Sequence, residues 1–115
     1  MKYTQGKYLI LSKKTLAKEI YDLTILCPDV AEAAVAGQFV NVKVDGFMLR
    51  RPISICSIDK NKGTLRIIFE VRGEGTKVMS QLVEGAMIDI VAPLGGRGFE
   101  MDGHETAVII GGGIG

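Results

Sequence analysis

Two short motifs hold the residues best suited to bind a charged, planar ligand, and the first of them is RRPIS. It places Arg51 directly before Pro52, Ile53 and Ser54. An arginine on a strand can bind a phosphate through two parallel hydrogen bonds. Proline cannot donate to a strand ladder and belongs at an edge or a bulge, where free backbone groups can meet a flat heteroaromatic ring. The simpler alternative is an edge strand with two exposed arginines.

The second motif is RGEGTKVM, in which Gly75 and Thr76 precede a segment with helical spacing of apolar residues. Backbone N–H groups at the start of a helix are free and carry a partial positive charge, so they suit a pyrophosphate. A glycine turn with Thr76 as the helix cap is the alternative. Together the two motifs favour a dinucleotide ligand.

A third candidate ends the chain, in the stretch TAVIIGGGIG. Residues 106–110 are predicted to form a continuously apolar strand, which runs into Gly111, Gly112 and Gly113. A buried strand followed by closely spaced glycines is typical of the first turn of a doubly wound nucleotide-binding domain. A glycine-rich tail is the alternative.

The remaining reactive residues do not form a catalytic constellation. His104 is the only histidine and is interpreted as a surface residue, and Glu70 is either a surface carboxylate or a contact to a ribose hydroxyl. Two cysteines are too few for a zinc or iron–sulfur site. Cys27 and Cys56 lie in strand-like segments and are predicted to be buried free thiols, although a disulfide is left open. This favours a reducing, cytoplasmic environment.

Length and composition set the broad class. The chain has 115 residues, 47% of them hydrophobic, with a formal net charge of +1, which is enough for one ordered globular domain. The absence of a basic tract argues against a nucleic-acid partner. The sequence also has no apolar segment long enough for a signal peptide or a membrane span.

Hydrophobic periodicity predicts a mainly β domain with one short helix. Val78, Met79, Leu82 and Val83 follow helical spacing between Gly75-Thr76 and Gly85. About six short antiparallel strands would close into a barrel, because closure removes exposed edges. Strands are predicted at GKYLILSKK (6–14), EIYDLTILC (19–27), QFVNVKV (38–44), FMLRRPISICSI (47–58), TLRIIFEVR (64–72) and AMIDIVAPLG (86–95).

The order GQFV, LRRPISI, GEGT, APLG and VIIGGGIG resembles the ferredoxin-reductase superfamily over the whole chain. More narrowly it resembles the electron-transfer subunits of two-subunit, NAD-dependent (class 1B) dihydroorotate dehydrogenases. The superfamily more often has an aromatic residue where this chain has Ile53. The resemblance implies a six-stranded antiparallel Greek-key barrel over residues 1–101. It also implies that residues 102–115 begin a truncated α/β domain for NAD(H).

The resemblance also implies roles for single residues. The family's flavin motif would fall on Arg51, Pro52, Ile53 and Ser54, with Arg51 holding the phosphates of FAD and with Ile53 and Ser54 lining the isoalloxazine. The other implied contacts are Ile68, Phe69 and Glu70 near the adenosine, Gly75 and Thr76 at the pyrophosphate, and Gly111, Gly112 and Gly113 at the NAD(H) site.

In the family, an FMN-containing catalytic subunit oxidises dihydroorotate in pyrimidine synthesis. Electrons then pass through a [2Fe–2S] cluster to FAD and on to NAD⁺. The resemblance implies that catalytic subunit as partner, in a heterotetramer. The chain is interpreted as ending at the first turn of the NAD domain. We therefore expect it to supply the FAD cradle, to be inactive by itself, and to self-associate through the exposed apolar strand at residues 106–110.

Two other functions remain open at this stage. One is the FAD subunit of a related sulfide dehydrogenase or ferredoxin–NADP reductase complex. The other is a cofactor-free β-barrel interaction module, since barrels of this shape serve many functions.

Overall fold

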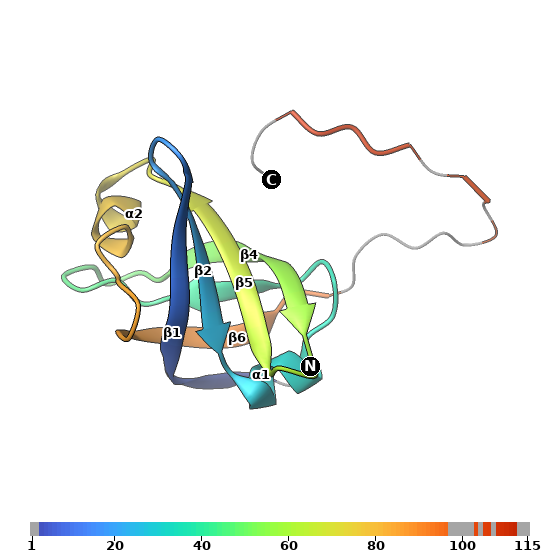
Figure 1. Cartoon of the computed structure of the whole chain (residues 1–115), viewed down its shortest axis with the longest axis horizontal. Helices are drawn as coiled ribbons and strands as arrows, with labels where there is room; N and C mark the ends of the chain where they lie inside the picture. Colours follow the sequence, from blue (N-terminus) through green and yellow to red (C-terminus); the bar gives the residue numbers. More distant parts are fainter. Residues whose placement is uncertain (1–2, 97–102, 104, 107, 113–115) are drawn as a thin grey trace.

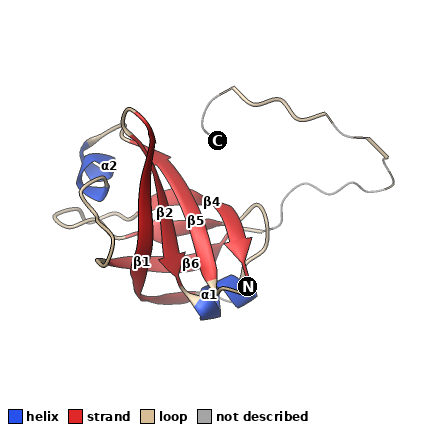
Figure 2. Ribbon diagram, in the orientation of Figure 1, coloured by secondary structure: helices blue, strands red, loops and turns tan. Residues whose placement is uncertain are grey.

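The computed structural model describes residues 3–96, 103, 105–106 and 108–112 (Figure 1). Within these residues it contains a closed barrel of six strands and two short helices (Figure 2). The elements are β1 (Thr4–Ala17), β2 (Ile20–Leu26), α1 (Pro28–Ala33), β3 (Phe39–Val42), β4 (Arg51–Asp59), β5 (Thr64–Glu70), α2 (Glu74–Met79) and β6 (Met87–Leu94).

The barrel has the strand order β1-β2-β5-β4-β3-β6, and β6 closes it by pairing with β1. Each neighbouring pair is antiparallel. Because β2 lies beside β5 and β3 beside β6, the chain crosses between non-consecutive strands as in a Greek key. The predicted six-stranded antiparallel barrel is therefore confirmed.

Alternating residues of the strands fill the barrel interior. Leu23 and Ile25 on β2 and Ile67 on β5 are fully buried, and they occupy the apolar side that the sequence pattern predicted for each strand. The other fully buried strand residues include Ile10, Val40, Val42, Leu65, Ile88 and Ile90.

β1 and β4 each pair with one neighbour along their first part and with another along the rest, and each contains register shifts of the β-bulge type. The first part of β1 pairs with β6 up to Leu9, and the remainder pairs with β2, with register shifts after Ile10 and Thr15. β4 pairs with β3 from Arg51 to Ser54 and with β5 from Ile55 onward, with a register shift between Ile55 and Ser57. A bulge adds one unpaired residue and increases the local twist, which lets one strand follow a curved barrel wall.

The helices differ from the prediction in number and length. Pro28 follows the end of β2 and is the first residue of α1, where its missing N–H and fixed φ are tolerated. α2 ends at Met79 and does not continue to Gly85. Beyond Met79 the chain forms i→i+3 turns, with the N–H of Leu82 donating to Met79 O. From these turns Leu82 packs against the core, whereas Val83 is 57% exposed.

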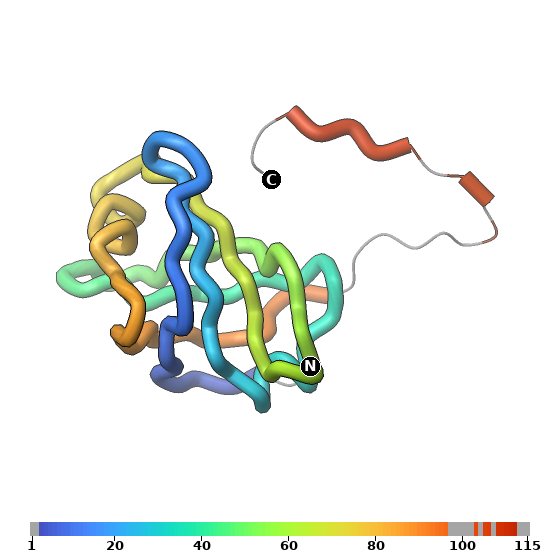
Figure 3. Tube along the Cα trace, viewed as in Figure 1, coloured from blue at the N-terminus to red at the C-terminus, as the bar shows by residue number. Residues whose placement is uncertain are grey.

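The strand predicted at 47–58 begins only at Arg51. The preceding residues form a projecting loop, in which Phe47 N–H donates to Val44 O, and Met48 and Leu49 are exposed. In the trace of Figure 3 this loop follows β3 and extends away from the barrel. Glycine at position 46, with φ +83°, permits the turn that starts it.

The strand predicted at residues 106–110 is wrong for the residues that are described there. Thr106 and residues 108–110 have no regular secondary structure, and Val108, Ile109 and Ile110 are each more than four-fifths exposed. A buried parallel strand is stabilised by neighbours that pair with both of its edges. The barrel strands pair among themselves and supply no such neighbour to this segment.

Neither of the two helices in the described part of the chain is long and apolar enough to cross a membrane.

The two cysteines are free, but only Cys27 is buried. The prediction that Cys56 is buried is wrong, because Cys56 lies at the bulge of β4 and its side chain faces outward. Burial, and then the charge of Asp29, raises the pKa of the Cys27 thiol to about 12. The reactive thiolate form of Cys27 is therefore scarce at neutral pH.

A maleimide should label Cys56 rapidly in the native protein, whereas Cys27 should react only after unfolding. Mass spectrometry with and without denaturant would measure this. Cys56→Ser is the control and should abolish labelling of the native protein. Equal labelling rates for the two thiols would contradict the burial of Cys27.

Substitution of the barrel interior should destabilise the fold much more than substitution on its surface. Ile67→Ala should lower the free energy of unfolding by about 2–5 kcal/mol, because it removes buried methyl groups and leaves a cavity. Leu11→Ala is the control, since Leu11 is 44% exposed. Urea denaturation of the three proteins would measure both effects, and equal losses would contradict the assigned core.

Candidate functional site

A pocket of about 400 Å³ lies on the outer face of the barrel, where β4 and β5 separate. The two strands are paired from Ile55 and Ile67 to the far end of the hairpin. On the other side of this point, β4 pairs only with β3, so its second edge is free beside the end of β5. The pocket is lined by Pro52, Ile53, Ser54, Ile55, Cys56, Ile68, Phe69, Glu70, Arg72 and Thr76.

This pocket brings together most of the residues that the sequence motifs singled out. Pro52, Ile53 and Ser54 come from the RRPIS motif, and Thr76 comes from the second motif. Segment 68–70 of β5 forms the facing wall. Pro52 lies opposite Asn41 of β3, on the half of β4 whose other edge is free, which matches the expectation that this proline occupies a local strand edge.

Exposure alternates along this half of β4, so Pro52, Ser54 and Cys56 share the outer face. Arg51 and Ser54 therefore point to opposite sides of the strand, as the spacing predicts. Pro52 and Ile68 contribute apolar surface to the pocket, and Ser54 contributes a hydroxyl group.

The Arg51 side chain lies beside the first turn of α2. Its Nη1 donates to Leu49 O at 2.8 Å, and its guanidinium lies 5.0 Å from the ring centre of Phe47. Gly75 makes this position possible, because a Cβ atom at residue 75 would stand 2.3 Å from Nε of Arg51. Arg51 thus packs against the first turn of α2 and is not among the residues that line the pocket.

The neighbouring Arg50 is directed elsewhere. Its Nη2 lies 3.1 Å from Asp89 Oδ1 on β6, and both side chains are four-fifths buried. The alternative interpretation of two exposed arginines is therefore wrong: Arg50 holds the barrel wall, and Arg51 faces the start of α2.

The connection from β5 to α2 is held by Thr76. The Thr76 hydroxyl accepts hydrogen bonds from the N–H groups of Arg72, at 2.8 Å, and Gly73, at 3.1 Å. The same hydroxyl donates to Gly73 O at 3.2 Å. Thr76 was considered as a helix cap, but Gly73 is the capping residue and Thr76 lies in the first turn, reaching back to it. The hydroxyl therefore shapes the turn, and the Thr76 backbone faces the pocket region.

An ion pair stands at the mouth of the pocket. Arg72 Nη2 lies 2.6 Å from Glu70 Oε1, with the Arg72 side chain 77% exposed and that of Glu70 29% exposed. Both residues line the pocket. The site therefore has apolar walls, one hydroxyl, one thiol and a charged rim, which suits a planar ligand with an anionic extension.

The sequence reasoning did not identify Ile55, Cys56 or Arg72 as site residues. Cys56 faces the pocket because it shares the outer face of β4 with Pro52 and Ser54, an alternation that the sequence analysis did not extend to it. Arg72 could have been proposed, since it directly precedes the GEGT motif that was singled out.

The predicted contacts at the chain end lie elsewhere. Gly111 and Gly112 are exposed and do not line this pocket, while Gly113 and His104 lie outside the described residues. Among the described residues, no group of three or more His, Cys, Asp or Glu side chains could hold a metal ion.

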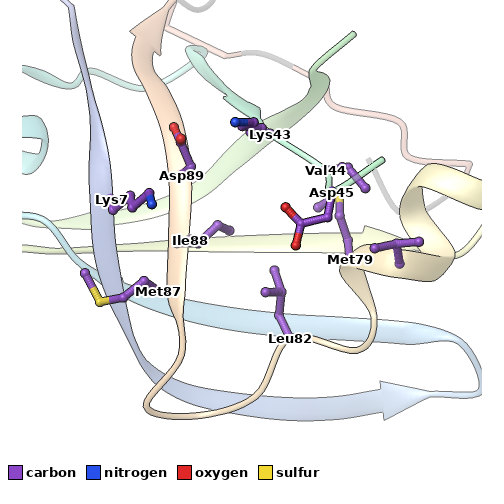
Figure 4. Close-up of a pocket in the computed structure, with 10 residues that line it drawn as sticks. Lys7, Lys43, Val44, Asp45, Met79, Leu82, Met87, Ile88 and Asp89 are labelled. Atoms are coloured by element: carbon purple, nitrogen blue, oxygen red, sulfur yellow. The ribbon is translucent and has the colours of Figure 1, made fainter. Parts of the chain in front are cut away.

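A smaller cavity of about 240 Å³ lies between the start of β1, the segment that follows β3, the end of α2 and β6 (Figure 4). Lys7, Lys43, Asp45 and Asp89 surround an apolar floor that includes Met79. Opposite charges alternate around it, and none of the predicted site residues contributes to it. The pocket between β4 and β5 is therefore the candidate site.

Comparison with known proteins finds relatives in sequence and in fold. No protein-family model matches the chain. The electron transfer subunit of dihydroorotate dehydrogenase B (NAD(+)) from Bacillus cereus (strain G9842) is 40% identical over 113 aligned positions, which cover 93% of this chain and 43% of that relative. The chain thus spans less than half the length of this curated relative.

Two of the solved structures with a similar fold are redox proteins. The NADH-dependent reduced ferredoxin-NADP oxidoreductase matches 80% of this chain and 34% of its own, with a TM-score of 0.74 and 30% identity. Phthalate dioxygenase reductase matches 84% of this chain and 32% of its own, with a TM-score of 0.67 and 20% identity, a likeness of fold. The chain is therefore similar in sequence to electron transfer subunits of dihydroorotate dehydrogenase B over 93% of its length, and its barrel is similar in fold to parts of the ferredoxin-NADP oxidoreductase and of phthalate dioxygenase reductase.

Proposed function

We propose that the pocket between β4 and β5 binds FAD, and that the chain is the FAD-binding part of an electron-transfer flavoprotein. The observation that carries the proposal is the convergence of the RRPIS motif, segment 68–70 and Thr76 on one pocket. In the family that the chain resembles, these segments are the expected flavin contacts.

The residues present fit a flavin ring. The pocket of about 400 Å³ falls within the range of roughly 300–1,000 Å³ typical of ligand sites. Pro52 and Ile68 offer apolar surface to a planar ring, and Ser54 offers a donor and acceptor to the ring edge. Ile53 replaces the aromatic residue that is commoner in the superfamily, so packing there depends on aliphatic contact. Phe69 is almost fully buried and supports the pocket from beneath.

The residues beside α2 fit the phosphates. Arg51 carries a guanidinium that can bind a phosphate through two hydrogen bonds. The lack of a side chain at Gly75 leaves room for that guanidinium against the first turn of α2. A dinucleotide in this site would extend from Ser54 toward Gly75 and Thr76, with Glu70 on the adenosine side.

When bound, FAD supplies a ring system that can accept or donate either one or two electrons. The residues of this chain bind that ring, orient it and shield one side of it from water.

For the protein as a whole we propose the role that the family relationship implies. Electrons from the oxidation of dihydroorotate, carried out on an FMN-containing catalytic subunit, would pass through a [2Fe–2S] cluster and this FAD to NAD⁺. The catalytic subunit would be the partner, in a cytoplasmic heterotetramer. Residues 1–101 would form the FAD domain, and residues 102–115, with Gly111, Gly112 and Gly113, would begin the domain for NAD(H).

A second candidate is the flavin subunit of a ferredoxin–NADP reductase complex. It is favoured by the likeness to the NADH-dependent reduced ferredoxin-NADP oxidoreductase at 30% identity. The two candidates share the FAD site and differ in the electron donor. Reduction of the bound flavin by a dihydroorotate-oxidising subunit, compared with reduction by ferredoxin, would distinguish them.

Titration with FAD and FMN tests the proposed site directly. We expect saturable quenching of flavin fluorescence with FAD, and weaker binding of FMN, because FMN lacks the second phosphate and the adenosine. Bound FAD should also slow maleimide labelling of Cys56, which lines the pocket.

If neither this chain nor one extended to the length of its relatives binds FAD, the proposed function is wrong. The cofactor-free barrel module would then be the remaining interpretation.

The contact between Arg51 and Gly75 should be required for FAD binding. Arg51→Ala should weaken FAD binding by roughly tenfold to a hundredfold, the value of one charge-assisted hydrogen bond of about 1.5–3 kcal/mol. Gly75→Ala should also weaken it, because the new Cβ displaces the guanidinium without changing the charge.

Gly73→Ala is the matched control. Its backbone is extended, with φ −162°, and a Cβ at that position meets nothing within 4 Å. Isothermal titration would give the four affinities. Retention of wild-type affinity by Gly75→Ala would argue against the assigned role of Arg51.

A further inference from the structure

A second arginine, Arg72, stands at the candidate site and has no role in the reasoning from sequence. It lines the same pocket as Ser54 and Glu70, and its side chain is 77% exposed. Its only charged contact among the described residues is the ion pair with Glu70, at 2.6 Å between Nη2 and Oε1.

The backbone of Arg72 is held in place although its side chain is exposed. Its N–H donates to the Thr76 hydroxyl at 2.8 Å, which ties residue 72 to the first turn of α2. On the same turn, Gly75 is in contact with the guanidinium of Arg51. Arg51 and Arg72 are therefore anchored to adjacent residues of α2, one through its side chain and the other through its backbone.

Two arginines held to one helical turn could match the charge of a diphosphate. A pyrophosphate bridge carries one negative charge on each phosphate, and arginine binds phosphate oxygens through its planar set of donors. A mononucleotide offers only one phosphate group, and riboflavin offers none. The pair of arginines therefore provides a physical basis for preferring a dinucleotide.

The ion pair with Glu70 does not prevent this role. Arg72 is largely in contact with water, and an ion pair made by such a group contributes little to stability, so the cost of exchanging Glu70 for another anion is small. Glu70 is the less exposed member of the pair and belongs to β5, whereas Arg72 lies beyond the strand end. Glu70 can thus hold Arg72 near the pocket until a phosphate replaces it.

We propose that Arg72 is a second phosphate-binding residue of the flavin site, which exchanges its ion pair with Glu70 for the pyrophosphate of the cofactor and so selects a dinucleotide over a mononucleotide. This inference rests on the proposed function, in which the pocket between β4 and β5 binds FAD.

The test compares FAD with riboflavin, which has the same ring and no phosphate. Arg72→Gln should weaken FAD binding by about tenfold, the effect of losing one charge-assisted hydrogen bond. It should leave riboflavin binding unchanged and reduce the dependence of FAD affinity on salt concentration. Arg72→Lys should restore part of the loss. Lys77→Gln is the matched control for charge, because Lys77 is exposed on α2 and does not line the pocket.

Glu70→Gln separates direct binding from a structural role. If Arg72 binds phosphate, Arg72→Gln should weaken FAD binding by a similar factor in the wild-type and in the Glu70→Gln background, because the phosphate contact does not need the carboxylate. If Arg72 acts only by holding Glu70 and the turn, Arg72→Gln should have no further effect once Glu70 is replaced, and that result would overturn the proposal. Wild-type FAD affinity in Arg72→Gln would overturn it too and leave the FAD site standing. A wild-type protein that binds no FAD would overturn the proposed function, and this inference with it.

Discussion

β4 changes its hydrogen-bonding partner halfway along its length, and the candidate site depends on that change. Its first residues pair with β3, and its last pair with β5. Strands of a closed barrel are twisted and staggered, so one strand can pair with different neighbours along its length. The bulge at Cys56 marks where β4 and β5 separate. Without this separation, the outer surfaces of Ser54 and Ile68 would lie along a continuous ladder with no pocket between them.

The same geometry explains why a proline is acceptable in a barrel strand. Pro52 has no N–H to donate, and its position on β4 faces a paired neighbour on one side only. A central strand position with partners on both sides would leave a ladder bond unmade. Pro52 thus lies on the part of β4 that is paired with β3 only, and this part of the strand lines the pocket.

The turn before α2 joins this opening to the charged part of the site. Thr76 satisfies two backbone N–H groups of the turn with a single hydroxyl, and Gly75 leaves the space that Arg51 occupies. Arg51 and Arg72 are both held at this turn, where Glu70 and Glu74 offset their charge. The turn therefore offers an anionic ligand directed guanidinium donors and not a net positive charge.

Strand periodicity in the sequence was sufficient to predict the barrel, because alternation in segments such as 64–72 requires one apolar face to be buried. The motif residues Pro52, Ser54 and Thr76 were also recognisable, since their chemistry is local. Other features depended on contacts between distant segments. The bulge of β4, the pairing of Arg50 with Asp89 and the approach of Arg51 to Gly75 all bring distant segments of the barrel together. Thr106 and residues 108–110 show the converse, because an apolar run by itself does not form a strand without neighbours to pair with.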